Sequence, residues 1–494
     1  MPQLSFDTTP ADPLKIHPED LPDIQGFIVH GYNMPKSRHF VLTIGQVGAA
    51  LDFLDALTSG SGVLSVTSAK RWPAGMKPEY ALNIGLTARG LEALKLPGSV
   101  SIDPGNFSSF LGGAVAAAKT VGDTGPNDPD NWVTKLNRAN ADLAHVLLSL
   151  YTNTPADREL YSAQLRTMFA QVIPPAGAPG NDVLEWDVDP EIFTDPATGE
   201  KYRKIHFGYT DGISNPIIDE VGLPPLRLNQ LPYVPAWQFV TRYGSPPTYV
   251  PPTYNMPAPL PFGQNGTFSA FRILEQNVPA FEAFLSADGR DEAAQEFLAS
   301  KLCGRWRNAN PVVLEPLKPG PTLPDDELSD FDYGTDKVGE PCPYSAHTRR
   351  TNSRGGPLVV PLGDKIDHRI MRRADAYGPP YTNVDDGQPR GLAGHFMCVM
   401  LADQFEFIMS QWVNSGTFPG GTAKAGIDPL LGNVPDGSSF TYWESGNPVT
   451  VEGLSRFVTT KGGLYCFLPS ITAIKWMAQN GGAANPWIIP PPPG

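Results

Sequence analysis

The sequence lacks the features of several common classes of protein. No segment approaches 18 uninterrupted apolar residues, which a membrane-spanning helix needs, and residues 1–7 have neither the basic nor the apolar region of a signal peptide. We therefore expect a cytoplasmic protein without a membrane partner, although a mature secreted form is compatible with the same residues. The four cysteines are widely spaced and form no CxxC pair, so we expect neither a zinc knuckle nor a disulfide scaffold.

Positive charge is also scarce. Lys and Arg total 37 against 51 Asp and Glu, a net charge of −14, which argues against nucleic acid as a partner because phosphate binding needs a positive surface. Hydrophobic residues make up 41% of the chain and charged residues 18%, a balance typical of globular proteins and not of disordered ones. The 53 prolines, about twice the usual share, predict a fold rich in loops.

Three segments share one order, a strand followed by an amphipathic helix. They cover residues 39–57, 267–285 and 395–412. Their positions in the two halves of the chain suggest a duplicated α+β domain. We expect a first domain over 20–223, a proline-rich connecting segment over 224–261 and a second domain over 262–480. A further helix over 291–303 should end at Gly304, a glycine suited to the left-handed position after a helix.

The densest group of cationic side chains lies at residues 347–354. It contains a single histidine, His347, with Arg349 and Arg354 nearby. One histidine cannot build a zinc cage, but one axial imidazole with several arginines would suit an iron porphyrin carrying two propionates. A solvated basic loop is the alternative.

Two other segments carry candidate chemistry. In residues 207–216, Asp211 lies between two glycines and is a candidate general acid/base or calcium ligand, or else part of a simple Asp-Gly turn. In residues 370–379, Arg372 and Arg373 follow an apolar stretch and precede a Tyr-Gly-Pro turn. Such an arginine can point into a cavity, although most Arg-Arg pairs are solvated.

Taken in order, these three segments resemble the dye-decolorizing peroxidases, and the length resembles the larger members of that family. The resemblance extends over about 450 residues. Further matching segments lie at 23–26, 265–272, 304–306, 404–408 and 456–470. No single motif is specific, whereas their joint order is.

The resemblance implies an α+β fold of two ferredoxin-like domains, with haem b bound in the second domain. It implies a peroxidase that reduces hydrogen peroxide and oxidises dyes, phenolic or other aromatic donors by one-electron steps. His347 would be the proximal iron ligand, supported by a carboxylate for which Asp403 and Glu406 are the candidates.

The same resemblance assigns the other site residues. Asp211 would move the peroxide proton, and Arg372 would stabilise the developing anion, with Arg373 as the rival if the register differs by one. Arg349 and Arg354 are the candidates for holding the haem propionates, or the loop that carries His347, and Arg305 is a further candidate for binding the cofactor. His395 either enters the distal pocket or lies on the other face of its strand.

Two other functions stay open at this point. A haem carrier, or a protein that releases haem iron, would need His347 but neither Asp211 nor Arg372. A calcium-dependent binding module would use Asp211 and no haem. The oligomeric state is not indicated by the sequence.

Overall fold

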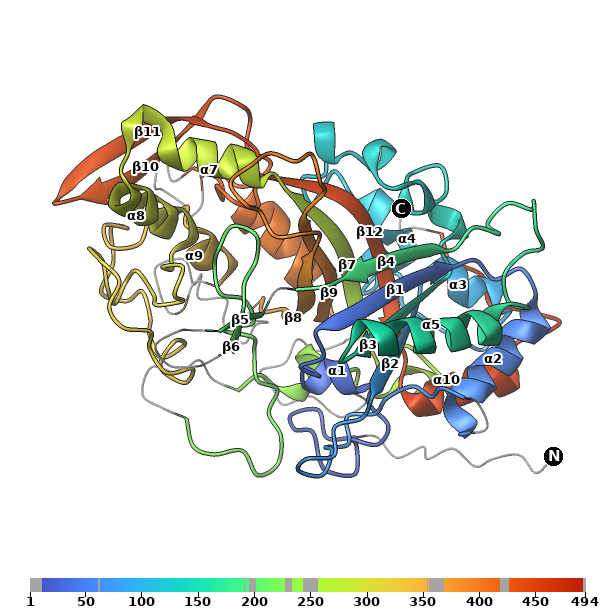
Figure 1. Cartoon of the computed structure of the whole chain (residues 1–494). Helices are drawn as coiled ribbons and strands as arrows, with labels where there is room; N and C mark the ends of the chain where they lie inside the picture. The colour runs from blue at the N-terminus through green and yellow to red at the C-terminus, as the bar shows by residue number, and fades with distance from the viewer. Residues whose placement is uncertain are drawn as a thin grey trace.

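The computed structural model describes residues 11–60, 63–190, 192–194, 201–226, 233–242, 256–352, 354, 368–417 and 426–491. Its centre is an eight-stranded antiparallel sheet with the order β4-β1-β3-β2-β12-β7-β9-β8 (Figure 1). Its strands are β1 (Lys36–Leu42), β2 (Tyr80–Leu86), β3 (Val146–Thr152), β4 (Leu184–Val188), β7 (Thr267–Gln276), β8 (Met371–Tyr377), β9 (Gly391–Cys398) and β12 (Val458–Leu468). Two separate hairpins pair β5 (Ile192–Thr194) with β6 (Lys201–Arg203), and β10 (Ser438–Glu444) with β11 (Asn447–Leu454).

Each half of the sheet has the same topology. In both halves the strands read fourth, first, third, second, and a helix follows the first and the third strand. In the first half these helices are α2 (Val47–Ser59) and α5 (Pro155–Phe169). In the second half they are α7 (Val278–Ser286) and a helix with π-type turns over Ala402–Glu406 and Ile408–Val413. This is the ferredoxin-like arrangement, so the predicted duplicated α+β fold is confirmed.

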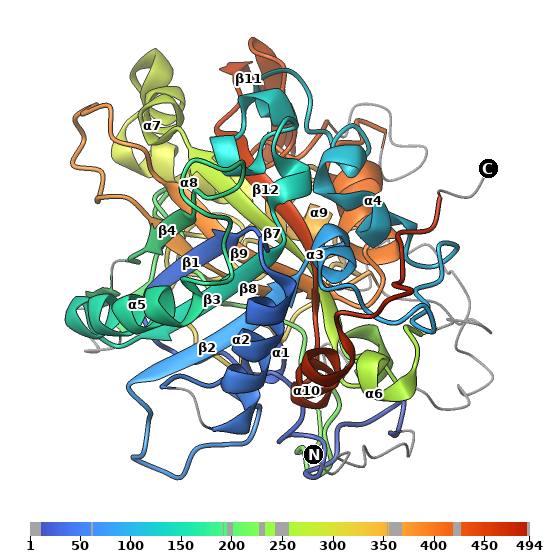
Figure 2. The same ribbon diagram turned by 90° about the vertical axis from the view of Figure 1, so that its right-hand side faces the viewer.

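The remaining helices cover the sheet and its edges. They are α1 (Gly26–Val29), α3 (Ala88–Ala93), α4 (Ser108–Ala117), α6 (Leu260–Gly263), α8 (Glu292–Cys303), α9 (His347–Thr351) and α10 (Ile471–Asn480). Figure 2 shows α2 and α5 beside the first-half strands. None of the helices in the described part of the chain combines the length and the apolar character that crossing a bilayer requires.

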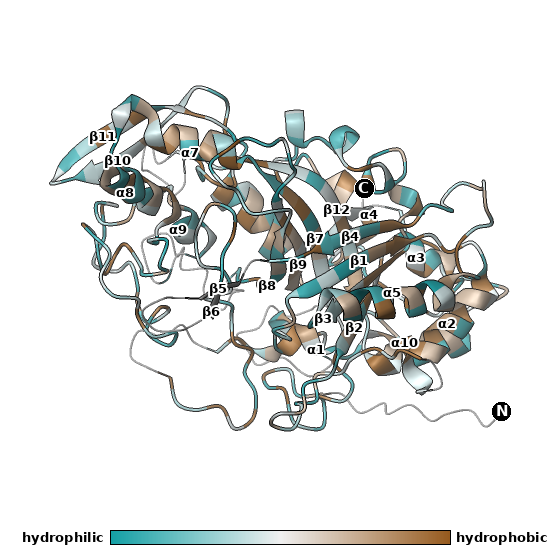
Figure 3. Cartoon of the chain, in the orientation of Figure 1, coloured by the Kyte–Doolittle hydropathy of each residue, from teal (hydrophilic) through white to brown (hydrophobic). Residues whose placement is uncertain are grey.

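Local sequence accounts for where these elements begin and end. The Thr154 side chain accepts a hydrogen bond from the Asp157 amide at the start of α5, and Pro155 occupies the first turn, where a helix tolerates proline. Helix α8 ends at Gly304 in the left-handed conformation (φ 86°), as predicted. Strand β7 is buried along nearly its whole length because both of its faces are covered. Figure 3 shows hydrophobic residues along the central strands, whereas β10 and β11 are mainly hydrophilic.

The two halves meet at the middle of the strand order and again between its two outer strands. Strands β2 and β12 are joined by a single residue pair, Leu86 with Phe467. The sheet also curls until its outer strands approach, and the rings of Trp186 on β4 and Tyr377 on β8 are 5.1 Å apart. The predicted domain boundaries stay a prediction, because the halves share this sheet and the segment 224–261 is described only in part.

At Gly394, which pairs with Ala374, strand β9 lies close against the backbone of β8. Its φ is 155°, and a Cβ atom there would lie 2.2 Å from the Arg373 carbonyl oxygen and 2.4 Å from the Ala374 Cα. Backbone atoms cannot yield as a flexible side chain can, so any larger residue must push the two strands apart.

We therefore expect Gly394→Ala to lower the free energy of unfolding by about 3 kcal/mol or more, or to prevent folding. Gly48→Ala is the matched control, since Gly48 is exposed on α2 and a Cβ there meets nothing within 4 Å. Chemical denaturation of both variants tests this. Equal stability of the two would show that the contact between β8 and β9 is looser than described.

Candidate functional site

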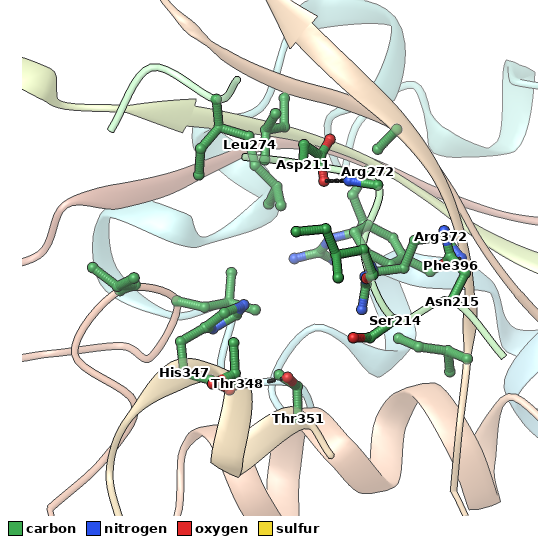
Figure 4. A pocket seen from close by; sticks show the side chains of 18 of the residues that line it. Asp211, Ser214, Asn215, Arg272, Leu274, His347, Thr348, Thr351, Arg372 and Phe396 are labelled. Carbon is green, nitrogen blue, oxygen red and sulfur yellow. Dashed lines mark hydrogen bonds between the residues drawn. The ribbon is translucent and has the colours of Figure 1, made fainter. Parts of the chain in front are cut away.

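A cavity of about 570 Å³ is lined by residues from both halves of the molecule (Figure 4). Its walls come from β7, β8, β9, the helix over 402–413, α9 and the loop over 207–216. Apolar side chains form much of the surface, namely Leu274, Leu392, Phe396, Phe405, Ile408 and Met409. Such a space suits a large, flat, mainly apolar ligand.

His347 is the first residue of α9 and points into this cavity. Its Nδ1 lies 2.7 Å from Oδ2 of Asp428, whose side chain is fully buried. The other oxygen of Asp428 accepts the amides of Leu430 and Leu431 at 2.8 and 2.9 Å. A carboxylate only accepts hydrogen bonds, so Nδ1 carries the proton and the lone pair of Nε2 is available on the cavity side. This is the arrangement of a histidine metal ligand held by a carboxylate.

The predicted carboxylate partners of His347 are therefore wrong. Glu406 accepts a hydrogen bond from Ser109 at 3.0 Å, and burial raises the pKa of Glu406. Asp403 is exposed at the start of the π-type helix, where its carbonyl contacts His368. Both residues lie on a helix that borders the cavity, but their side chains are turned away from His347.

Arg349 does not line the cavity, so its predicted role at the propionates is wrong, whereas its alternative role, holding the loop that carries His347, fits its contacts. Its guanidinium donates to Oδ2 of Asp336 at 2.7 Å and to the Asp336 carbonyl at 2.6 Å. The same group lies between the rings of Tyr333 and Tyr344, at 4.6 and 4.4 Å. Arg349 thus fastens the segment before His347, and a helix of five residues keeps its position through such contacts.

Arg305 and Arg354 do line the cavity, and they lie together. Each donates to the hydroxyl of Ser214, at 3.0 and 2.8 Å, and each lies over the ring of Phe331. Within the described residues, neither has an ion pair with a carboxylate. Burial and the charges of neighbouring arginines lower the pKa of Arg354 to about 10. A buried surplus of positive charge is a site for an anion.

Asp211 lies on the loop that closes another wall of the cavity. Its amide donates to the Arg203 carbonyl at 2.8 Å, and its Oδ1 accepts the Gly212 amide at 2.7 Å. Gly208 and Gly212 both have positive φ, 88° and 82°. The two glycines that bracket Asp211 therefore permit the turn that presents it.

Arg372 approaches this loop from β8. Its amide donates to Oδ1 of Asn215 at 3.0 Å, and its guanidinium donates to the Ile213 carbonyl at 2.6 Å. Burial lowers the pKa of Arg372, and the charge of Asp211 opposes that shift. The rival Arg373 points to the other face of the strand, where its Nε donates to the Phe27 carbonyl at 2.8 Å. Strand alternation thus brings Arg372, and not Arg373, to the Asp211 loop.

His395 does not reach the cavity, so the distal alternative is wrong. Its ring lies between the hydroxyls of Ser149 and Ser269, at 2.8 and 3.0 Å. Ser149 also contacts His39 at 2.9 Å. Burial lowers the pKa of His395 well below its usual value. Phe396, the next residue on β9, takes the cavity face.

The described residues give the calcium interpretation no support. Across the described ranges, no group of three or more His, Cys, Asp or Glu side chains could hold a metal ion. The function that Asp211 serves must come from its charge and its neighbours.

Several site residues were missed by sequence reasoning. Asp428 lies 81 positions after His347 and belongs to no motif, so nothing in the sequence pairs the two. Ser214 and Asn215 stand in the same short motif as Asp211, and their polar side chains in a glycine-rich turn were a usable signal. Asp375, three residues after Arg372, also lines the cavity.

No protein-family model matches the chain. It is 28% identical to Peroxidase 2 of Mycetinis scorodonius over 493 residues, which cover 92% of the chain and 87% of that protein. It is 27% identical to dye-decolorizing peroxidase AauDyP1 of Auricularia auricula-judae, covering 92% and 86%. The multifunctional dye peroxidase DyP2 of an Amycolatopsis strain is also 27% identical, covering 92% and 95%.

Solved structures of such enzymes share the fold. A fungal DyP-type peroxidase from Auricularia auricula-judae superposes with a TM-score of 0.72 at 24% identity, covering 93% of this chain and 99% of that one. A dye-decolorizing peroxidase in complex with 2,6-dimethoxyphenol gives 0.74 at 24% identity, with the same coverage. Similarity in sequence and in fold thus extends over nearly the whole chain, and the protein belongs to the dye-decolorizing peroxidase family.

Proposed function

We propose that the protein is a haem peroxidase that reduces hydrogen peroxide and oxidises dyes, phenols or other aromatic donors in one-electron steps. One observation carries the proposal. The cavity presents a carboxylate-supported imidazole, His347, on one wall and the Asp211–Arg372 pair on another. A haem enzyme that cleaves peroxide needs both.

The residues of the cavity fit haem b. The Nε2 of His347 would bind the iron, and the Asp428 carboxylate would make that imidazole a stronger donor. The apolar walls would cover the porphyrin faces. Arg305 and Arg354 would receive the propionates, which explains why two buried cations lack a carboxylate partner in the described chain.

The protein's own contribution to peroxide cleavage is a proton transfer. When bound, the haem iron would supply the oxygen ligation and the redox equivalents. The Asp211 carboxylate accepts the proton of one peroxide oxygen and returns it to the other, which leaves as water. The backbone amide of Asp211 donates a hydrogen bond to the Arg203 carbonyl. This bond holds the loop that carries the carboxylate at the cavity.

Arg372 stabilises the negative charge that develops on the leaving oxygen. Burial lowers the pKa of Arg372, and the negative charge of Asp211 opposes that shift and so favours the charged guanidinium. Its bond to the Ile213 carbonyl also fixes the distance between the cation and the Asp211 loop. The two residues therefore act as one unit, on a strand and a loop that hold each other.

Replacing either member of this unit should abolish turnover while the haem stays bound. We expect Asp211→Asn and Arg372→Leu each to lower kcat/KM for peroxide by about 100-fold or more. Asp55→Asn, an exposed change on α2, is the control. Steady-state kinetics, with the Soret band as the measure of loading, test the prediction.

The outcomes separate the candidate functions. Full turnover in both variants would refute the proposed roles of Asp211 and Arg372. A wild-type protein that binds haem but shows no peroxide-dependent oxidation would instead be a haem carrier. If haem supplementation produces no Soret band, both haem functions are wrong.

The carboxylate behind His347 gives an independent prediction. We expect Asp428→Asn to weaken haem binding by about 10- to 100-fold, because an amide cannot support the imidazole as a carboxylate does. The Fe(III)/Fe(II) potential should become more positive, since less negative charge reaches the iron. Haem titration and spectroelectrochemistry measure these effects, and Asp403→Asn should leave both unchanged. The reverse pattern would restore Asp403 as the partner.

A further inference from the structure

Asp375 is a second carboxylate on the cavity wall, and the peroxide step proposed above does not use it. It lies on β8, three residues after Arg372. Because β8 is the last strand of the sheet, the cavity extends past its edge and is lined by residues of both strand faces. Asp375 therefore lines the same cavity as Arg372, although the two side chains lie on opposite faces of β8.

We call the part of the cavity near Asp375 its outer lobe and define it by six of the lining residues: Gly31, Tyr32, Asn33, Tyr151, Arg203 and Asp375. Gly31 and Asn33 are exposed, which places this part of the cavity at the surface. The rings of Tyr32 and Tyr151 meet edge to face at 5.5 Å. Aromatic walls of this kind suit a flat aromatic donor.

The carboxylate of Asp375 is held in place at this lobe. Arg203 donates through one nitrogen to both of its oxygens, at 2.7 and 2.9 Å, and also contacts Asn33. Only 15% of the Asp375 side chain is exposed. A carboxylate offers about four acceptor positions, so the bond to Arg203 leaves room for a donor hydroxyl.

The charges around Asp375 set when it is ionised. Burial and then the Asp211 carboxylate raise its pKa to about 6, against the opposing effect of Arg203. Arg373 precedes it by two residues on the same strand, and the Ala393 that pairs with it on β9 is uncharged. Burial raises the pKa of both Tyr32 and Tyr151, so these hydroxyls keep their protons. Asp375 is therefore the proton acceptor of this lobe.

We propose that Asp375 is the catalytic base for phenolic donors, which bind in the outer lobe and transfer their hydroxyl proton to its carboxylate. This inference rests on the peroxidase function proposed above. The O–H bond of the phenol breaks and its proton passes to an Asp375 oxygen; the bound haem, once oxidised by peroxide, would take up its electron. A phenoxyl radical leaves, and Asp375 returns the proton to solvent through the opening at Asn33.

A comparison of two donors tests the role of the proton. 2,6-Dimethoxyphenol loses a proton when it is oxidised, whereas the sulfonated dye ABTS loses only an electron. In the haem-loaded enzyme, Asp375→Asn should lower kcat/KM for the phenol about tenfold or more and leave that for ABTS within about twofold. Asp375→Glu, which keeps a carboxylate, should recover much of the phenol activity.

The pH dependence provides a second readout. The carboxylate exists above the raised pKa of Asp375 and is lost as the pH falls through about 6. The ratio of phenol to ABTS activity should therefore fall below about pH 6 in the wild type and change less in Asp375→Asn. Infrared difference spectra of the resting enzyme should show a carboxyl group that titrates in this range and is missing from the variant.

Each outcome decides the matter. An equal loss with both donors would overturn the proposal and make Asp375 a residue that merely positions the Asp211 loop through Arg203. Unchanged phenol oxidation in Asp375→Asn would also overturn it. Absence of peroxide-dependent oxidation of either donor by the wild type would instead refute the peroxidase function itself, and this inference with it.

Discussion

The hydrogen bond between His347 and Asp428 is the interaction on which the rest of the cavity depends. It determines which nitrogen of the imidazole faces the cavity, and hence whether the histidine can bind a metal at all. Helix α9 is too short to keep this ring in place by itself. Arg349 fastens the segment before it, and Arg350 donates to the carbonyls of Trp412 on the neighbouring helix and of Ser415 just after that helix. Burying an arginine normally costs free energy, but the buried Arg349 and Arg350 here hold α9 in position through their hydrogen bonds.

Charge is distributed unevenly around the cavity, so that one end suits the binding of an anion and the other suits proton transfer. At one end Arg305 and Arg354 lie close together without a carboxylate partner in the described chain. On the β8 side, Asp211 faces Arg372, and Asp375 is paired with Arg203. In the proposed function the two haem propionates would complete the first end, while the other end has two carboxylates in different environments. Different environments let two groups of one type do different proton chemistry.

The sequence predicted what local patterns encode. Strand–helix periodicity gave the duplicated fold, and short motifs led to His347, Asp211 and Arg372, because each role depends on neighbours within a few residues. Asp428 could not be found, since its contact with His347 exists only after the chain folds. Arg349 and Arg354 look alike in sequence, but Arg349 lies within α9 and pairs with Asp336, whereas Arg354 follows the helix and lines the cavity. Whether His395 reaches the cavity depends on the alternation of side chains along β9, because a shift of one residue moves a side chain to the opposite face of the strand.

The buried chain of His39, Ser149, His395 and Ser269 has a consequence for how the halves are joined. His39 and Ser149 belong to β1 and β3, whereas His395 and Ser269 belong to β9 and β7. If only apolar side chains lay between them, one half of the sheet could shift relative to the other at little cost in free energy. Directional hydrogen bonds favour a single alignment. The backbone adds only one residue pair between β2 and β12. These four hydrogen-bonded residues therefore help to set how the two halves are aligned. The alignment in turn sets the spacing between the Asp211 loop, which continues from the first half, and His347 in the second half.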